Sequence, residues 1–526
     1  MRPPAAQLRS LRQRELALPT TTGTRRGDAA DAAGGRGPRG APMIWIVLGC
    51  LAVSALTLAY PTTPTYDPWA WVMWGREILH LDLVTTGGPS WKPLPILFTT
   101  PFSLFGDDLA PYLWVWIARA GGLLGCAMAF RVARRLIGGG WYGSVAGVAA
   151  AAALLSSNKY VRDAALGNSE PLLAALSLWA FERHLDGRRD HALYLGVACA
   201  LLRPEVWPFL GLYGLWLWFQ EPRLRARMVG FAVLIPALWF LPELWGSGDP
   251  FRAGERANAP NPGSAAYAAS PAIELIKRHI AVTIAPVEAG TFIAAVYAAV
   301  RWLTRRREAP TVALALGGFA WLALVAVMTE AGFAGNQRYL IVTTAVMCVL
   351  GGMGAVRVLQ GVEWAAVRLT GNVRTAAVAA AITFVIGIGI STPTIVAKWD
   401  NTRRVNGGLE HEAYLWHDLK SLIDDAGGKE RLLACGHIFS GPFQIQMVAY
   451  ELGLHGIDVG WKETPAPGVV FRTRTVPDGP LVTKPTDDRF RLVAQDGKWR
   501  LLTVPPAGDR GGCPAASPDT PTAPAA

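Results

Sequence analysis

A series of long apolar segments, separated by short arginine-rich stretches, most constrains what this chain can fold into. Of its 526 residues, 51% are hydrophobic and 21 are tryptophan, a composition typical of a polytopic membrane protein. We therefore predict about eleven transmembrane helices, near residues 43–60, 109–130, 143–157, 166–182, 191–202, 205–219, 229–246, 287–303, 311–329, 339–356 and 375–393.

The arginines between these segments determine the expected topology. If the N-terminus is cytoplasmic, every inner loop carries at least three arginines, as the positive-inside rule requires, and the C-terminal region is extracytoplasmic. A further span at 94–106 would reverse every later loop, so we expect that segment to lie on the membrane surface. One kinked span over 191–219, in place of two, would also break the alternation. This pattern predicts a multi-pass protein of the plasma (inner) membrane.

The regions outside the predicted spans differ in composition. Residues 1–42 hold eight arginines and few large apolar residues, so we predict a disordered cytoplasmic tail before a transmembrane domain at 43–394. Residues 395–505 have the pattern of a small extracytoplasmic α/β domain, with helices at 409–426 and 442–454, strands at 431–438 and 457–461 and a hairpin at 490–504. Residues 506–526 are rich in proline and alanine and are predicted to be disordered.

The net charge of +11 does not indicate nucleic-acid binding. From residue 395 to the end, 15 basic and 16 acidic residues nearly cancel. The excess positive charge lies in the N-terminal tail and the short loops, where it fits cytoplasmic loops better than a nucleic-acid surface.

The outer loop at 61–108 is neither a span nor an ordinary linker. Asp67 and the following proline indicate a helix start, and the helix that follows carries tryptophans beside charged residues, as at a membrane–water interface. Lys92 stands before the thirteen-residue segment 94–106, which is too short to span. We predict two interfacial helices, headed by Asp67 and Lys92.

Several of these residues resemble the first outer loop of GT-C glycosyltransferases, in particular protein O-mannosyltransferases and the aminoarabinose transferase of lipid A. The resemblance covers roughly the first 200 residues and is carried by Asp67, Gly75–Leu79, Lys92–Pro95 and Phe102–Gly106. Those families have an acidic residue after the first span, a Lys-Pro-Pro-Leu or His-Pro-Pro-Leu motif, and an arginine in the next span, to which Arg119 corresponds.

The chain departs from these families in two places. Many relatives have paired acids where this chain has Asp67 followed by proline, and its Lys-Pro-Leu-Pro motif is a variant, so a second acid is unassigned. The resemblance implies a GT-C fold and transfer of a hexosyl or pentosyl group from a polyprenyl-phosphate donor to a glycan, lipid or protein acceptor, with inversion at the anomeric carbon.

Polar residues gather on the predicted outer face in five separate segments, which suggests a shared site. The segments are the 67–92 loop, 158–170, 203–205, the outer loop 246–286, and 336–339.

Sugar transfer needs a base for the acceptor hydroxyl and positive charge at the leaving phosphate. We predict Asp67 as the base. The predicted phosphate-binding residues are Lys92, Arg338, Tyr339, Arg162, Arg203 and Arg119, and the possible sugar or acceptor contacts are Glu77, Asp163, Glu170 and Glu205.

Each of these residues also has a structural interpretation. Asp67 could be a plain helix cap, the arginines could form buried ion pairs such as Arg162–Asp163 or Arg203–Glu205, and Tyr339 could be an interfacial anchor. The tryptophans of the first outer loop fit membrane-belt anchors better than sugar platforms.

No clustered triad of acids or cysteine spacing indicates a metal, so we predict no cofactor, although acidic residues at 107, 108 and 249 leave a divalent cation open. Cys435 and Cys513 could pair in an oxidising compartment, whereas the composition around Cys513 argues against a fixed partner.

Two other function classes remain. A transporter or flippase of lipid-linked sugars often has repeated halves and mid-membrane charges, which this sequence does not show. A non-catalytic scaffold would need no cavity joining Asp67, Lys92 and Arg338.

Overall fold

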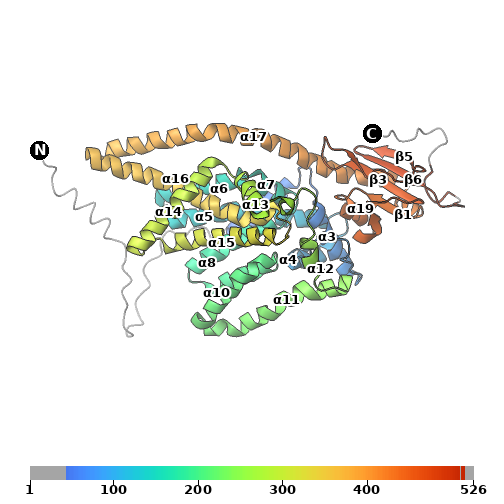
Figure 1. Cartoon of the computed structure of the whole chain (residues 1–526), viewed down its shortest axis with the longest axis horizontal. Helices are drawn as coiled ribbons and strands as arrows, with labels where there is room; N and C mark the ends of the chain where they lie inside the picture. The colour runs from blue at the N-terminus through green and yellow to red at the C-terminus, as the bar shows by residue number, and fades with distance from the viewer. Residues whose placement is uncertain (1–42, 510, 516–526) are drawn as a thin grey trace. The chain divides into compact units, whose positions relative to one another are not determined.

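The computed structural model describes residues 43–509 and 511–515. The predicted disorder of residues 1–42 and 516–526 lies outside these residues. The described chain is mostly helical and ends in a small six-stranded sheet (Figure 1). The helices before residue 373 are α2 (Met43–Thr57), α3 (Tyr66–Leu79), α4 (Pro93–Phe102), α5 (Ala110–Ile137), α6 (Gly140–Leu155), α7 (Asn158–Ala165), α8 (Glu170–Leu185), α9 (Arg189–Ala200), α10 (Trp207–Gln220), α11 (Arg225–Ser247), α12 (Arg252–Ala257), α13 (Pro271–Ile280), α14 (Ala285–Arg305), α15 (Ala309–Glu330) and α16 (Ile341–Thr370).

Each of the eleven predicted apolar segments falls on a helix, but the count of eleven spans is not confirmed. Within the described residues, five helices are long and apolar enough to cross a membrane, at Ala110–Ile137, Pro222–Ser247, Ala309–Glu330, Gln337–Thr370 and Val373–Asp425. A sixth is possible if α13 and α14, which meet at 106°, form one broken span. Helices α8, α9 and α10 have 16, 12 and 14 residues, fewer than the roughly 20 that span a bilayer.

The first outer loop forms the two short helices that the sequence predicts, α3 and α4. Thr65 is the N-cap of α3, so Asp67 lies inside the first turn, and its interpretation as a helix cap is wrong. Gly75 allows α4 to approach closely, because a Cβ atom there would lie 2.6 Å from Thr99. The Thr99 hydroxyl donates to the Trp71 carbonyl at 2.7 Å and ties the two helices together.

The tryptophans of α3 are buried within the protein, so their interpretation as membrane-belt anchors is wrong. Trp69, Trp71 and Trp74 are at most 2% exposed. Their rings pack at 5.0 to 5.6 Å against other aromatic rings, Trp416, Trp114 and Trp91 respectively. Aromatic packing of this kind fixes α3 on several sides.

A single 53-residue helix, α17 (Val373–Asp425), connects the membrane helices to the C-terminal sheet (Figure 1). The predicted span at 375–393 and the predicted helix at 409–426 are therefore two ends of one helix. The change in composition at Ile395 falls inside this helix. Composition changes with the surroundings of the side chains, whereas the helical backbone hydrogen bonds continue past Ile395. The helix stops at Gly427 and Gly428, whose φ values of 95° and 91° favour glycine.

The C-terminal sheet has the strand order β2-β1-β3-β6-β5, with β4 paired to β3. Strand β1 is parallel to β2 and β3, and β6 is antiparallel to β3 and β5. The strands are β1 (His437–Ser440), β2 (Val459–Gly460), β3 (Gly468–Arg474), β4 (Leu481–Val482), β5 (Arg491–Asp496) and β6 (Trp499–Val504), and the accompanying helices are α18 (Lys429–Leu433) and α19 (Ile445–Leu452).

The predicted hairpin at 490–504 is confirmed as β5 and β6. The predicted strand at 431–438 is wrong over its first half, which is α18, and the strand begins at His437. The central strand β3 was not predicted, because it follows a short run of proline and glycine with no clear alternation.

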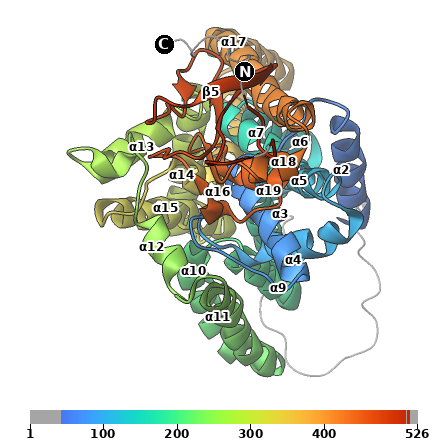
Figure 2. The same cartoon turned by 90° about the vertical axis from the view of Figure 1, so that its right-hand side faces the viewer.

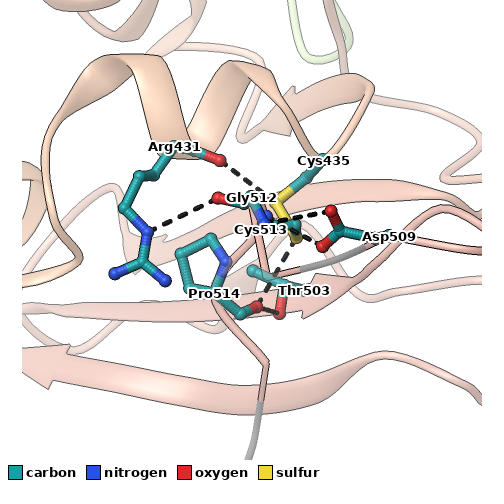
Figure 3. Close-up of a disulfide and its surroundings, with 7 residues drawn as sticks. All are labelled: Arg431, Cys435, Thr503, Asp509, Gly512, Cys513 and Pro514. Atoms are coloured by element: carbon teal, nitrogen blue, oxygen red, sulfur yellow. Dashed lines mark hydrogen bonds between the residues drawn. A yellow bond between two sulfur atoms is a disulfide. The ribbon is translucent and has the colours of Figure 1, made fainter.

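Cys435 and Cys513 form a disulfide (Figure 3). It joins the end of the described chain to the segment before β1, so the expectation that Cys513 has no fixed partner is wrong. The Asp509 carboxylate accepts hydrogen bonds from the backbone N–H groups of Gly512 and Cys513, and the Thr503 hydroxyl donates to the Pro514 carbonyl. These bonds give the segment an ordered path despite its composition.

Candidate active site

Glu170, the first residue of α8, lies at the centre of a buried group of charged side chains. Its Oε1 atom accepts hydrogen bonds from Lys92 Nζ at 2.8 Å and from Arg203 Nη1 at 2.9 Å. Arg338 Nε lies 3.9 Å from the same oxygen. Burial lowers the pKa of Lys92, and the Glu170 carboxylate opposes that effect. Three cations from separate segments thus surround one carboxylate, and two of them, Arg203 and Arg338, also pair with Glu205 and Asp67. We call Glu170 and the three cations, Lys92, Arg203 and Arg338, the cationic group.

Arg338 connects the cationic group to Asp67. Its Nη2 atom donates to Asp67 Oδ2 at 2.5 Å, and its Nη1 atom donates to Asn168 Oδ1 at 3.1 Å. The side chains of Asp67 and Arg338 are 13% and 18% exposed, whereas those of Lys92 and Glu170 are 7% and 1% exposed. Asp67 and Arg338 therefore form the accessible side of the group.

Arg203 contributes to two interactions at once. Its Nε atom lies 3.1 Å from both carboxylate oxygens of Glu205, and its guanidinium stands 4.0 Å from the centre of the Tyr339 ring. The ion pair between Arg203 and Glu205, one of the alternatives from the sequence, is thus present. It does not exclude Arg203 from the site, since its Nη1 atom bonds to Glu170.

Four of these side chains directly precede a proline in the first turn of a helix. The segments fold in this way because proline is accepted in the first turn of a helix. Lys92 and Arg203, which stand just before their helices, have the extended backbone that a following proline favours. A cation at such a position is unfavourable by itself, because the N-terminus of a helix carries partial positive charge. Glu170 offsets this cost for Lys92 and Arg203. The four residues are Asp67, Lys92, Glu170 and Arg203.

Asp163 belongs to a second layer behind Asp67. The Asn168 side chain, which also bonds Arg338, donates to Asp163 Oδ1 at 3.3 Å, and Lys159 Nζ donates to the same oxygen at 2.7 Å. Burial raises the pKa of Asp163. The predicted acid in α7 is thereby linked to the site through one amide.

Three predicted residues lie outside this network. Arg162 pairs with Glu412 of α17 at 2.5 Å, so the alternative pairing of Arg162 with its neighbour in α7 is wrong. Arg119 donates to the carbonyls of Thr57 at 2.7 Å and Ala165 at 3.2 Å. Glu77 lies at the other end of α3 from Asp67 and bonds to the C-terminal sheet domain.

Sequence reasoning did not single out Ser169 or Asn168, and it interpreted Trp71 as a membrane anchor. The Ser169 hydroxyl lies 3.0 Å from Lys92 Nζ, and the Trp71 ring is 5.0 Å from the same atom. The signal for the first two was their position beside Glu170 in one polar run. For Asp67, Lys92, Glu170 and Arg203, the sequence feature that indicates the site is a charged residue followed by a proline near the start of a helix.

The candidate site has no arrangement that suggests a metal centre. Among residues 43–509 and 511–515, no three or more His, Cys, Asp or Glu side chains are grouped closely enough to hold an ion. The carboxylates of the site are instead bonded to lysine, arginine and asparagine.

Comparisons with known proteins give a match in fold only. No family model matches the chain, and no curated protein matches its sequence. It is structurally similar to ArnT from Cupriavidus metallidurans bound to undecaprenyl phosphate, with a TM-score of 0.53 and 14% identity over 88% of this chain and 97% of that one. The apo structure of ArnT gives a TM-score of 0.52 and 15% identity over the same shares.

ArnT is the lipid A aminoarabinose transferase, a GT-C enzyme. The resemblance to GT-C glycosyltransferases that the first outer loop indicates is therefore confirmed at the level of the fold, well beyond the 200 residues that carry it in the sequence. This chain shares the fold of ArnT over most of its length.

Proposed function

We propose that this protein is an integral-membrane glycosyltransferase that moves a sugar from a polyprenyl-phosphate donor to an acceptor on the extracytoplasmic face. The observation that carries the proposal is the convergence of Asp67 and the cationic group, joined by Arg338. The fold similarity to ArnT, one of whose structures is bound to undecaprenyl phosphate, supports a lipid-phosphate donor.

The cationic group is suited to a leaving phosphate. Cleavage of the sugar–phosphate bond gives the departing polyprenyl phosphate the bonding electron pair, so negative charge grows on its oxygens in the transition state. Fixed cations in a water-poor site stabilise such charge most strongly. Arg338, on the accessible side, offers a guanidinium that can hold two phosphate oxygens at once, and Lys92 adds a point charge.

Asp67 is suited to the acceptor hydroxyl. Its Oδ2 atom is occupied by Arg338, and no described residue bonds to Oδ1. In the proposed reaction, Oδ1 accepts the hydroxyl proton, the hydroxyl oxygen bonds to the anomeric carbon, and the carbon–phosphate oxygen bond breaks. A single displacement of this kind inverts the anomeric configuration.

Two buried oxygens are suited to sugar hydroxyls. Glu170 Oε2 and Asp163 Oδ2 are enclosed and have no hydrogen-bond partner among the described residues. An unpaired buried acceptor costs about 1–3 kcal/mol, which a hydroxyl of the bound donor would recover. This supports the predicted contacts of Asp163 and Glu170 with the sugar. For Glu205, which Arg203 holds on both oxygens, we propose a positioning role.

The experiment is transfer of radiolabelled sugar from synthetic polyprenyl-phosphate donors, hexosyl and pentosyl, by the purified protein in liposomes with a membrane-extract acceptor. We expect the label to leave the donor for a larger product with wild type and not with Asp67→Asn. Movement of intact donor between leaflets would instead establish a transporter. Neither transfer nor movement by correctly folded protein would establish a scaffold.

A further inference from the structure

Strands β3 and β6 place two arginines directly opposite each other. Their register pairs Arg472 with Arg500. Side chains so paired share one face of the sheet with Cβ atoms about 4.5–5.5 Å apart, and like charges there are destabilising. In the part of the chain that the structure describes, no carboxylate forms an ion pair with either guanidinium. An anion bound between or beside the two guanidinium groups would reduce their repulsion.

Arg472 makes this arrangement more costly, because it is buried. Its side chain is largely enclosed at 6% exposure, and its Nε atom has no hydrogen-bond partner. Burial and the charge of Arg500 both lower its pKa. Other enclosed arginines of the described chain have partners: Arg203 and Arg252 pair with carboxylates, and Arg119 donates to two backbone carbonyls. The pair in the sheet is an exception to that pattern.

Arg500 also lines a pocket of about 270 Å³ at the hairpin end of the sheet. Its wall includes Arg474, Lys498, Gln495 and His411, and no aspartate or glutamate. This volume is below the roughly 300 Å³ at which drug-sized ligand sites begin, so the pocket fits one small charged unit.

The cationic side chains of the pocket form no ion pair with any described carboxylate. Arg474 donates to the Gly479 carbonyl, and Lys498 Nζ lies 5.8 Å from the centre of the Tyr414 ring. Arg500 makes no hydrogen bond to another described side chain. Three positive charges thus line one opening, and among the described residues no carboxylate lies in its wall. Asp418, beside the wall, accepts a hydrogen bond from the Lys498 backbone N–H at 2.9 Å.

We propose that this pocket binds an anionic saccharide unit, whose phosphate or carboxylate group is held by Arg474, Lys498 and Arg500. Guanidinium groups bind both kinds of oxyanion through paired hydrogen bonds. The Gln495 amide can bond to a sugar hydroxyl. The choice of a saccharide rests on the proposed function, since the acceptor of such an enzyme must be brought to it, whereas the requirement for an anion rests on the charges alone.

The test is calorimetric titration of the full-length protein in detergent with glucose 6-phosphate, tetragalacturonate, inorganic phosphate and neutral maltotetraose. We expect at least one of the two anionic saccharides to bind more tightly than inorganic phosphate, and maltotetraose not to bind. Arg500→Gln and Arg474→Gln should each weaken binding roughly 10- to 100-fold, since each removes a charge-assisted hydrogen bond. Lys484→Gln, an exposed residue outside the pocket, makes the same charge change and should have no effect.

Thermal unfolding provides a second measurement that does not depend on affinity. Without ligand, Arg500→Gln should have a Tm equal to or above that of wild type, because it removes the repulsion across the strands. The proposal is overturned if neither anionic saccharide binds, if inorganic phosphate binds as tightly as both, or if Lys484→Gln weakens binding as much as Arg500→Gln. No sugar transfer is measured, so these outcomes are separate from a failure of the proposed enzyme activity.

Discussion

At the scale of single residues, Arg338 has the most connected position in the candidate site. It touches the proposed base, the amide that leads to the second acid, and the carboxylate that holds the other cations. It can therefore respond to a bound phosphate and transmit the change to Asp67 within one side chain. Under the proposed function, this geometry would couple binding of the donor to the orientation of Asp67.

Replacing Asp67 by asparagine should reduce turnover by roughly 10²–10⁴-fold with little change in donor binding. Asparagine has nearly the same volume and can still accept from Arg338, but it cannot take up the acceptor proton. The measurement is steady-state transfer from a synthetic polyprenyl-phosphate sugar, with protein folding checked by its unfolding temperature. A variant that keeps most of its rate would exclude Asp67 as the base and leave Asp163, which Asn168 links to Arg338, as the next candidate.

Replacing Lys92 by alanine should mainly weaken donor binding. The lysine charge faces the phosphate in the ground state and the transition state alike, so KM for the donor should rise more than kcat falls. The matched control is Lys462→Ala, an exposed lysine of the C-terminal sheet domain. An unchanged KM with a reduced kcat would show that Lys92 acts only on the transition state.

At the scale of elements, α3 presents two different faces. Tyr66, Trp69, Arg76 and Glu77 lie along one side, at helical spacing, and contact the C-terminal sheet domain. Helix α19 packs on this side of α3 (Figure 2). Arg76 donates to the Tyr450 carbonyl at 3.0 Å, and Trp69 packs against the Tyr450 ring at 5.2 Å. The sheet domain thus fixes the helix that carries Asp67.

The contact between Glu77 and His455 should make this docking depend on pH. Their Oε1 and Nδ1 atoms are 2.8 Å apart; burial lowers the pKa of His455, but the bond to Glu77 outweighs it and raises the pKa above the usual 6.5. The group therefore contributes stability fully below pH 6.5, and this contribution is lost as pH rises through the higher folded value.

The measurement is the difference in Tm between wild type and His455→Gln across pH 5.5–9. We expect the wild-type advantage to be largest at the acidic end and to shrink as pH rises. His417→Gln, an exposed histidine on α17, is the control and should show no such trend. A constant difference at all pH values would mean that the contact is a neutral hydrogen bond.

Element positions were largely predictable, and their ends and joins were not. Apolar segments and the pattern of the β5–β6 hairpin depend on local composition, which a sequence displays. The continuity of α17 through Pro393 could not be predicted, because a proline inside a helix usually kinks or ends it. The site was predictable in part: the charged residues at helix starts were recognised, but Asn168 and Ser169 became visible only when Lys92 and Arg338 were brought beside them.

At the scale of the whole molecule, the arginine alternation predicts a cytoplasmic N-terminus and an extracytoplasmic sheet domain. Reporter fusions after Arg135 and after Asp400 should therefore report opposite sides of the membrane. This predicted orientation would place the disulfide of the sheet domain in an oxidising compartment, where such bonds persist. Reporters on the same side would overturn the topology.

Loss of the disulfide should destabilise the sheet domain without abolishing the site. The bond joins residues 78 apart in sequence, and removing a native disulfide from a small domain costs about 2–5 kcal/mol. Cys435→Ser with Cys513→Ser should lower the Tm relative to the Cys50→Ser control, whose thiol is free. Equal melting of both proteins would show that the hydrogen bonds around Asp509 hold the chain end without the bond.

The length of α17 sets a rule for how this chain can vary. In a continuous helix of 53 residues, each residue added or removed rotates the following part of the chain by about 100° and shifts it by about 1.5 Å along the axis. One extra residue near Ile395 would swing the sheet domain away from α3, whereas seven residues would restore the rotation but raise the domain by about 10 Å. The number of residues in α17 thus fixes both the distance and the rotation of the sheet domain relative to the membrane helices. Natural variants should keep this number constant.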